Sequence, residues 1–544
     1  MITGWILCAA IVISLLLAGT ILFHYFQLES YQFPGYFRTV RRNLFKALLP
    51  GVCVAVLTFA TLIIGELLMP PRIWYAGPDT TETLLFIGEV LILIAGGYLI
   101  GRKLKEKKAK KAFVMTPRVK RLYAVSFVVM TIILYFSLQG LNSLTGTSVA
   151  VIFLFVFPLL LPLWVALCGL IAWPIEKAIS EMYFRDAQKI LRGRKDLIRI
   201  GITGSWGKTS VKFILGTILE EKYHTLVTPA SYNTPMGVTK VIRSKLEPGH
   251  RVFIAEMGAR HVGDIKEMCR LVHPQLGLIT SVGPQHLDTF KTVERVAKTK
   301  YELIDALPAD GEAFFADDGD ICRELYEKTE LNKHLTGLDP EKDEVWAQDI
   351  RYSPEGSDFT LCRGKERIAC RTQLLGELNI RNILLCASVA LSLNLSLEQI
   401  ARGISKIRPV DHRLQLIRHS GGLNVIDDAF NSNIRGAQQA FEVLKQFPPN
   451  RVIVTPGMVE LGEKEEEMNR AFGTAMAGCC DMAVLVGRKR SEAIAAGLRA
   501  AGFPDKNLFV TSSLEEATTL IRHKTGAGDT VLFENDLPDN YSER

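Results

Sequence analysis

The sequence lacks several features that define common classes of protein. Its 544 residues include ten cysteines but no C-x-x-C pair, which argues against a zinc site or a disulfide framework. It contains no G-x-S-x-G or catalytic cysteine motif, so no nucleophile typical of hydrolases is evident. No internal repeat or low-complexity tract stands out. With 48% hydrophobic and 22% charged residues, the chain is too apolar to be disordered.

The hydrophobic residues are concentrated in the first third of the chain. A membrane-crossing helix takes about 20 residues, and five segments are apolar over such a length: 4–24, 47–69, 84–101, 122–140 and 148–173. The first lacks the basic start of a secretory signal, and further spans follow it. Pro158 and Pro162 interrupt the last span and fit either a kinked helix or a re-entrant turn. The sequence predicts a transmembrane region of about five helices in residues 1–173.

The distribution of basic residues indicates how this region is oriented. Segment 102–121 is densely basic, and Lys and Arg near short loops are retained on the cytoplasmic side. We therefore predict a multi-pass membrane protein with its N-terminus outside and everything after Trp173 in the cytoplasm. The basic segment either sets this topology or also contacts anionic lipid or a lipid-linked phosphate. Because it lies between two apolar segments, the net charge of +7 favours a lipid bilayer and no nucleic acid as partner.

A phosphate-binding loop is expected after the membrane region. Residues 174–196 mix apolar and charged side chains and predict an amphipathic linker helix. The strand-like segment 197–203 leads into Gly204-Ser-Trp-Gly-Lys-Thr-Ser210 and then a helical segment. Such a layout surrounds phosphates with backbone N–H groups. We expect Lys208 to reach the β- and γ-phosphates of ATP, and the Thr209 hydroxyl to bind Mg²⁺.

This loop resembles that of the Mur ligases, the ATP-dependent ligases of bacterial cell-wall synthesis. The likeness runs through most of residues 197–535 and is greatest to the branch that joins D-alanyl-D-alanine to UDP-N-acetylmuramoyl-tripeptide. It implies a P-loop Mur-ligase central domain at 197–408 and a Rossmann-like C-terminal domain at 409–544. Together with the N-terminal helices, the expected fold class is a membrane α-helical region followed by α/β domains. It also implies ATP and Mg²⁺ as cofactors and a location at the bacterial cytoplasmic membrane.

The resemblance also assigns roles to individual residues. It implies that Lys208, His286, Lys300 and Arg413 are catalytic, with Lys300 carried as an N-carboxylated side chain. Magnesium ligands would be Thr209, Glu256, His286 and Lys300. ATP would contact Gly204, Ser205, Gly207, Lys208, Thr209, Ser210, Asn379, Asn382 and Arg413, together with Asp427 or Asp428. Substrate would contact Asn233, Asn431 and Asn433.

The chain departs from the family pattern at several positions. Leu378 stands at the usual histidine of the adenine-site segment, and Phe430 stands at a usual tyrosine. The usual Lys-Gly-Ser-Arg turn near the C-terminus is replaced by the acidic segment 532–540. A site that held a substrate carboxylate through basic side chains would now repel it or prefer an amine. The incoming amine, an amino acid or a dipeptide, therefore stays open.

The expected reaction is the formation of an amide through an acyl phosphate. The family's UDP-sugar domain is replaced here by the membrane region, so the acceptor is either a UDP-linked cell-wall precursor or one that is lipid-linked or polymeric. Transporters and non-catalytic scaffolds can also bind ATP. A transporter driven by ATP would carry a Leu-Ser-Gly-Gly-Gln signature, which is absent. A non-catalytic nucleotide-binding scaffold remains an alternative. Closure of the last domain over ATP predicts a hinge near Pro409.

Overall fold

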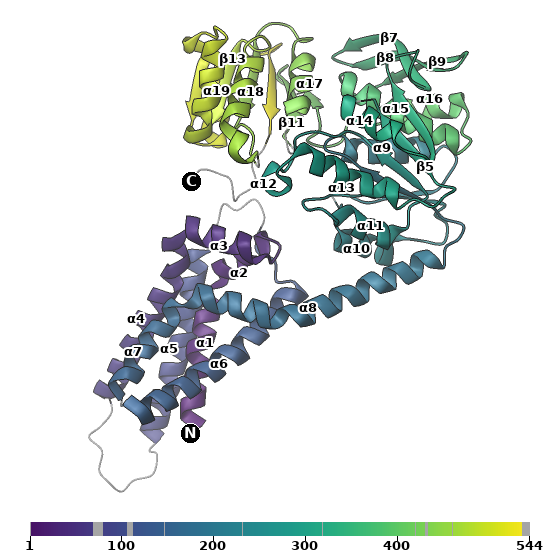
Figure 1. Cartoon of the computed structure of the whole chain (residues 1–544). Helices are drawn as coiled ribbons and strands as arrows, with labels where there is room; N and C mark the ends of the chain where they lie inside the picture. Colours follow the sequence, from purple (N-terminus) through teal and green to yellow (C-terminus); the bar gives the residue numbers. More distant parts are fainter. Residues whose placement is uncertain are drawn as a thin grey trace. The chain divides into compact units, whose positions relative to one another are not determined.

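The computed structural model describes residues 2–68, 80–105, 112–145, 147–230, 232–317, 319–418, 420–429, 434–459 and 461–535. The chain divides into two compact units, Met1–Glu181 (unit 1) and Met182–Arg544 (unit 2) (Figure 1). Unit 1 is helical, and unit 2 contains two sheets with helices around them. The fold class expected from the sequence is confirmed.

The helices of unit 1 are apolar over most of their length. Among the described residues, four helices are long and apolar enough to cross a membrane, and the bent pair α1 and α2, with 51° between its halves, together meets the same test. The bounds are α1 (Ile2–Ala18), α2 (Thr20–Leu28), α3 (Phe33–Arg42), α4 (Leu44–Leu68), α5 (Thr80–Leu104), α6 (Pro117–Thr145), α7 (Thr147–Leu159) and α8 (Leu161–Arg192).

The predicted fifth span, 148–173, is divided into two helices. The short apolar helix α7 ends at Leu159, and α8 begins at Leu161 and continues to Arg192. Proline lacks a backbone N–H and is tolerated at the start of a helix, so Pro162 favours a new helix at this point. The Tyr36 hydroxyl donates to the backbone carbonyl of Pro162 at 2.9 Å. The interruption that the prolines predicted is therefore a break between helices, and α8 runs without interruption through position 174.

The first sheet of unit 2 has nine strands in the order β2-β3-β1-β4-β5-β6-β7-β8-β9. The strands from β2 to β7 in that order run parallel, and β7, β8 and β9 form an antiparallel extension that the sequence did not predict. Their bounds are β1 (Ile198–Thr203), β2 (Thr225–Val227), β3 (Val252–Glu256), β4 (Leu276–Ile279), β5 (Glu312–Ala316), β6 (Asn332–Gly337), β7 (Val345–Ser353), β8 (Gly356–Arg363) and β9 (Glu366–Thr372).

Helices cover this sheet and complete its hydrophobic core. Two clusters of buried residues pack against the strands. One includes residues of α9, α15 and α16. The other includes residues of α10, α11, α13 and α14, together with the last turns of α8. The bounds are α9 (Lys208–Leu219), α10 (Pro235–Lys245), α11 (Asp264–Val272), α12 (Leu287–Phe290), α13 (Val293–Asp305), α14 (Asp320–Glu327), α15 (Glu377–Ser392) and α16 (Leu397–Lys406).

The second sheet has six strands in the order β10-β11-β15-β12-β13-β14. All neighbours are parallel except the edge pair β10 and β11, which agrees with the predicted Rossmann-like pattern. The elements are β10 (Gln415–Arg418), β11 (Asn424–Asp428), α17 (Ile434–Leu444), β12 (Arg451–Thr455), α18 (Glu465–Met476), β13 (Met482–Val486), α19 (Arg488–Ala500), β14 (Leu508–Thr511), α20 (Leu514–Lys524) and β15 (Thr530–Glu534), with short 3-10 helices at Gly462–Lys464 and Asp505–Asn507.

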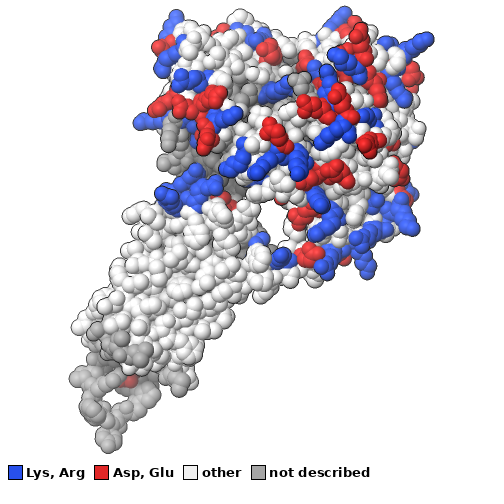
Figure 2. All heavy atoms as spheres, viewed as in Figure 1, with Lys and Arg blue, Asp and Glu red and all other residues white. Residues whose placement is uncertain are grey.

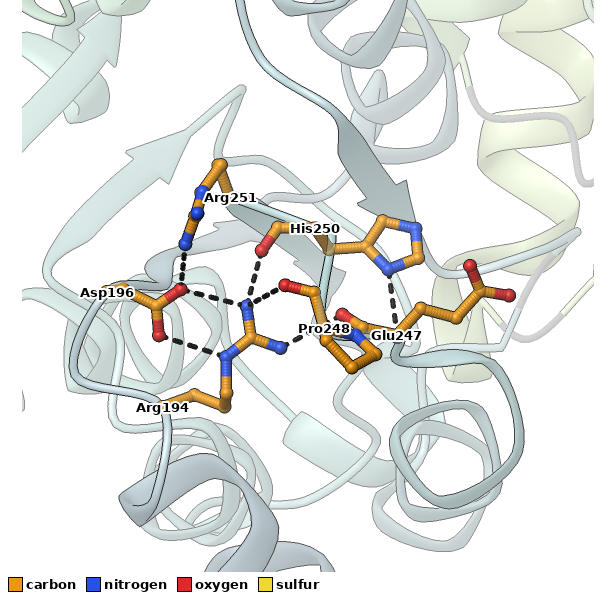
Figure 3. Close-up of polar contacts among 6 residues, drawn as sticks. All are labelled: Arg194, Asp196, Glu247, Pro248, His250 and Arg251. Atoms are coloured by element: carbon orange, nitrogen blue, oxygen red, sulfur yellow. Dashed lines mark hydrogen bonds and ion pairs between the residues drawn. The ribbon is translucent and has the colours of Figure 1, made fainter.

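The end of α8 is built into the first sheet's core. Phe184, Ala187 and Leu191 are buried there. Just beyond the helix, Arg194 donates to the carbonyl oxygens of Glu247 at 2.9 Å, Pro248 at 3.1 Å and His250 at 2.5 Å (Figure 3). The same guanidinium holds both carboxylate oxygens of Asp196, which lowers the pKa of that carboxyl to about 2. The chain that leaves α8 is thereby fixed to the loop before β3.

We expect Arg194→Ala to loosen this loop. The three carbonyls lose a charged donor, which costs about 1–2 kcal/mol of stability. The measurement is thermal unfolding of the full-length protein in detergent, together with proteolysis at the neighbouring Arg251. Lys195→Ala removes an exposed neighbour and serves as the control. Equal behaviour of the two variants would show that the network around Arg194 contributes nothing.

Candidate active site

The phosphate-binding loop lies between β1 and α9. The strand ends at Thr203 and the helix begins at Lys208, as the glycine pattern predicts. Gly207 caps the helix with φ 81°, and a Cβ atom there would lie 3.0 Å from Asn382 Oδ1. A Cβ atom on Gly204 would lie 2.1 Å from Thr280 Oγ1. Only glycine fits these two positions, which leaves the backbone N–H groups of the loop able to surround an anion.

Lys208 is held against the loop that it follows. Its ammonium donates to the carbonyl oxygens of Gly204 at 2.6 Å and Ser205 at 3.0 Å. Desolvation lowers its pKa to about 8, opposed by the Glu256 carboxylate and reinforced by the positive charge of Arg413. The cation predicted to bind phosphate is therefore positioned at the loop.

Glu256 is the centre of a buried polar cluster at the end of β3. Its Oε2 accepts from the Thr209 hydroxyl at 3.0 Å and from the Lys212 ammonium at 2.9 Å. Its Oε1 accepts from the Asn233 amide at 3.0 Å. Lys212 also donates to the carbonyl of Ala230, which precedes Asn233 in the same loop. Three predicted site residues, Thr209, Asn233 and Glu256, are thus brought together.

The charges of this cluster keep Glu256 ionised. Burial alone would raise the pKa of its carboxyl, but the ammonium groups of Lys212 and Lys208 outweigh burial and hold the pKa below its usual value. An ionised carboxylate beside a hydroxyl is the kind of oxygen donor set that Mg²⁺ prefers. Within the ranges that the structure describes, no group of three or more His, Cys, Asp or Glu side chains is arranged to hold a metal.

Lys300 lies on the helix α13, and His286 immediately precedes the neighbouring helix α12. Lys300 is 2% exposed on α13. Burial lowers the pKa of its amine well below the usual value, and the charge of Lys208 lowers it further. A lower pKa favours the neutral amine, the form that reacts with carbon dioxide to give a carbamate, and the carboxylates of Asp264 and Glu302 oppose this shift. His286 is half-buried and caps the short helix α12 with φ 52°.

The two asparagines expected near adenine have different surroundings. Asn382 lies against Gly207 of the phosphate-binding loop. Asn379 donates to the carbonyl of Leu375 at 2.9 Å and braces the start of α15. The structure therefore places Asn382 at the loop and gives Asn379 a bond within its own segment.

Arg413 lies in the connection between the two sheets of unit 2. Burial lowers the pKa of its guanidinium, and the carboxylates of Asp428 and Glu256 oppose that effect, so Arg413 lies within electrostatic reach of both domains. The connection is attached to β11: the His412 ring and Asp427 are 2.7 Å apart, and the Leu414 N–H donates to Asp428 at 3.0 Å.

The C-terminal segment that departs from the family pattern begins in β15, which pairs with β11. Glu534 is fully buried at the end of β15, where it is the register partner of Asp428 on β11. Burial raises the pKa of Asp428 to about 6. An acidic pair therefore stands at the carboxyl ends of β11 and β15, in the segment where the family pattern has a basic turn. Phe430, Asn431, Asn433 and residues 536–540 lie outside the described residues.

Sequence reasoning missed two residues of this site. Lys212 belongs to the loop motif but received no role, because its partner Glu256 lies 44 positions away. Trp206, inside the loop, lines a cavity with Asp317, Leu378, Arg381 and Arg435. An aromatic residue between the glycines of the loop is the sequence signal by which Trp206 could have been found.

Comparison with known proteins identifies relatives of unit 2. Family models match at residues 202–390, described as the Mur ligase middle domain, and at 412–534, described as the Mur ligase, glutamate ligase domain. Neither match includes α1 to α8.

Individual proteins match over the same part of the chain. The UDP-N-acetylmuramoyl-tripeptide–D-alanyl-D-alanine ligase of Escherichia coli (strain K12) is 29% identical over 57% of this chain and 69% of its own. That of Mycobacterium tuberculosis (strain CDC 1551 / Oshkosh) is 30% identical over 66% of this chain and 73% of its own. A crystal structure of MurF from Acinetobacter baumannii matches with a TM-score of 0.60 and 26% identity, covering 66% of this chain and 77% of the other.

Proposed function

The chain belongs to the Mur ligase family of ATP-dependent amide-bond-forming ligases, and from that premise we propose that it joins an amine to a carboxylate of a cell-wall precursor at the cytoplasmic membrane. The proposal rests on one cluster of side chains. Thr209 of the phosphate-binding loop and Asn233, which the family resemblance assigns to the substrate, both donate to the carboxylate of Glu256. Nucleotide and acceptor are thereby brought to the same carboxylate.

The proposed reaction has two steps. A carboxylate oxygen of the acceptor attacks the γ-phosphorus of ATP, forming an acyl phosphate and releasing ADP. The amine then attacks the acyl carbon, the bond to the phosphate oxygen breaks, and the amine loses a proton as the amide forms. The site is rich in cations and contains no nucleophile of its own, so its contribution is positioning and neutralisation of charge.

Particular residues carry these contributions. Lys208 binds the β- and γ-phosphates, and Arg413, from the connection, pairs with the γ-phosphate through its planar guanidinium. Thr209 and Glu256 would supply oxygen donors for Mg²⁺, and His286 and a carbamate on Lys300 would be further ligands. A bound Mg²⁺ would supply positive charge that neutralises the phosphates. Asn233 faces the acceptor, and Asp427 or Asp428 takes the ribose.

The surface of unit 1 supports a location in the membrane. Figure 2 shows that its visible face carries few charged side chains and that Lys and Arg gather at one end. Arg41 and Arg42 end α3, and Arg102 and Lys103 end α5. Because such residues are retained on the cytoplasmic side, we propose that these helix ends face the cytoplasm, where ATP and cell-wall precursors are available.

Phosphate release tests the proposal and identifies the substrates. Full-length protein in detergent receives Mg²⁺-ATP, an acceptor and an amine, with Lys208→Ala as the blank. The acceptor is UDP-N-acetylmuramoyl-tripeptide or a membrane lipid extract, and the amine is D-alanyl-D-alanine or an amino-acid pool. Release that needs both an acceptor and an amine supports a ligase. Binding of ATP without turnover in every combination would favour the scaffold instead.

The connection between the sheets should respond to ATP. Lys406 is exposed, and the following segment from Arg408 to Leu414 is attached to β11 by two hydrogen bonds. If closure brings Arg413 onto the γ-phosphate, ATP lowers the rate of tryptic cleavage after Lys406 several-fold. Cleavage at Arg371, an exposed residue of β9, is the internal control. Unchanged protection at 405–415 would show that the hinge is misplaced.

A further inference from the structure

A cavity of about 240 Å³ adjoins the phosphate-binding loop, and its lining includes Trp206, which has no role in the chemistry above. Its walls come from the loop, from the start of α15 and from α17 of the second sheet. The Trp206 indole and the Leu378 side chain are its apolar walls, and charged and amide side chains surround them. A mostly polar cavity with one large aromatic wall can hold a planar ligand that both stacks and forms hydrogen bonds.

The Trp206 wall is held in place before any ligand binds. Its backbone N–H donates to Ser281 Oγ at 2.8 Å, and its carbonyl accepts from the same hydroxyl at 2.9 Å. The indole lies against Gly283, where a Cβ atom would be 2.4 Å from the ring. Only 9% of the residue is exposed. A fixed aromatic surface loses little conformational entropy when a planar ring stacks on it.

The rim of the cavity offers both hydrogen-bond donors and acceptors. Arg381 donates to Glu377 Oε1 at 2.8 Å and to the Asp317 carbonyl at 2.9 Å. These bonds fix charged groups at the entrance of the cavity. Arg435 and Gln438 reach the cavity from α17. Such a rim suits a heterocycle that carries both ring nitrogens and an amino group.

Trp206 stands between Ser205 and Gly207, inside the loop assigned to the phosphates. A base joined to those phosphates through a ribose stays close to the same loop. We propose that Trp206 stacks on the adenine ring of ATP, so that the loop that binds the phosphates also binds the base. This inference rests on the proposed function and extends it by assigning the base contact to a particular side chain.

Two ligands separate the base from the phosphates. ADP carries both, whereas inorganic tripolyphosphate carries phosphates alone, and both are titrated calorimetrically into full-length protein in detergent. Stacking of a base on an aromatic side chain changes affinity by about tenfold or more. We expect Trp206→Ala to raise the Kd of ADP at least tenfold and to leave the Kd of tripolyphosphate within twofold. Trp206→Phe, which keeps an aromatic face, should bind ADP within about threefold of the original protein.

The controls keep the result interpretable. Trp173→Ala removes an exposed tryptophan of unit 1 and should change neither Kd. Trp206→Leu, which keeps an apolar side chain but no aromatic face, should also raise the Kd of ADP and answers the question even if the alanine variant fails to fold. Equal losses for both ligands, or no loss for either, would overturn the stacking contact while leaving ATP binding intact. If the original protein bound neither ADP nor tripolyphosphate, the proposed function would be overturned as well.

Discussion

Lys208→Ala should lower ATP-dependent phosphate release about 10²–10³-fold, the loss typical of removing one preorganised charge from a transition state. The Lys208 ammonium lies at the loop carbonyls of Gly204 and Ser205, where a phosphate would replace them as its partner. The Lys208 side chain is not part of the hydrophobic core, so the variant should fold. The measurement is the rate of phosphate release with saturating acceptor and amine.

A matched lysine provides the control. Lys298 lies on α13, near Lys300 in sequence, but its side chain is exposed. Lys298→Ala should release phosphate at the original rate. If both variants were equally active, Lys208 would have no role at the phosphates and the loop would bind another ligand.

Lys212→Met should destabilise unit 2 more than any other single change considered. The ammonium is fully buried and pairs with Glu256 at 2.9 Å. Removing one partner of a buried ion pair costs about 3–5 kcal/mol, because the other charge stays without compensation. For a domain of this size we expect the unfolding midpoint to fall by roughly 10 °C.

Thiol labelling can follow this unfolding in detergent. Cys386 is fully buried in the core against α9, so a thiol-reactive dye reports when that core opens. The double variant Lys212→Met, Glu256→Gln should recover part of the loss in stability, since neither charge remains, but should stay inactive. A single variant as stable as Lys298→Met would contradict the account of this cluster.

Local patterns in the sequence were sufficient for much of the fold. The glycines of the loop and the apolar strand before it placed β1 and α9 correctly, because both signals lie within a few residues. The parallel pattern of the second sheet was also confirmed. The antiparallel strands β7 to β9 were missed, although two-residue connections at 354–355 and 364–365 join them and such connections are a local hairpin signal.

Long-range contacts account for the rest. Lys212 could not be assigned a role, because its two partners, Glu256 and Ala230, meet it only after the sheet and the loop that contains Ala230 have formed. Pro158 and Pro162 signalled an interruption, but their local sequence did not determine that it is a break between α7 and α8. The roles of His286, Lys300 and Arg413 stay predictions that rest on the family resemblance.

The most direct test of the central claim follows an oxygen atom. An acceptor whose carboxylate is labelled with ¹⁸O is incubated with the full-length protein, Mg²⁺-ATP and the amine, and the released phosphate is analysed by mass spectrometry. In the proposed reaction the acceptor oxygen that attacks the γ-phosphorus leaves with the phosphate, so each amide formed yields one labelled phosphate. Phosphate without label would show that water, and not the acceptor carboxylate, attacks ATP, and would contradict the assignment of this chain as an acyl-phosphate ligase.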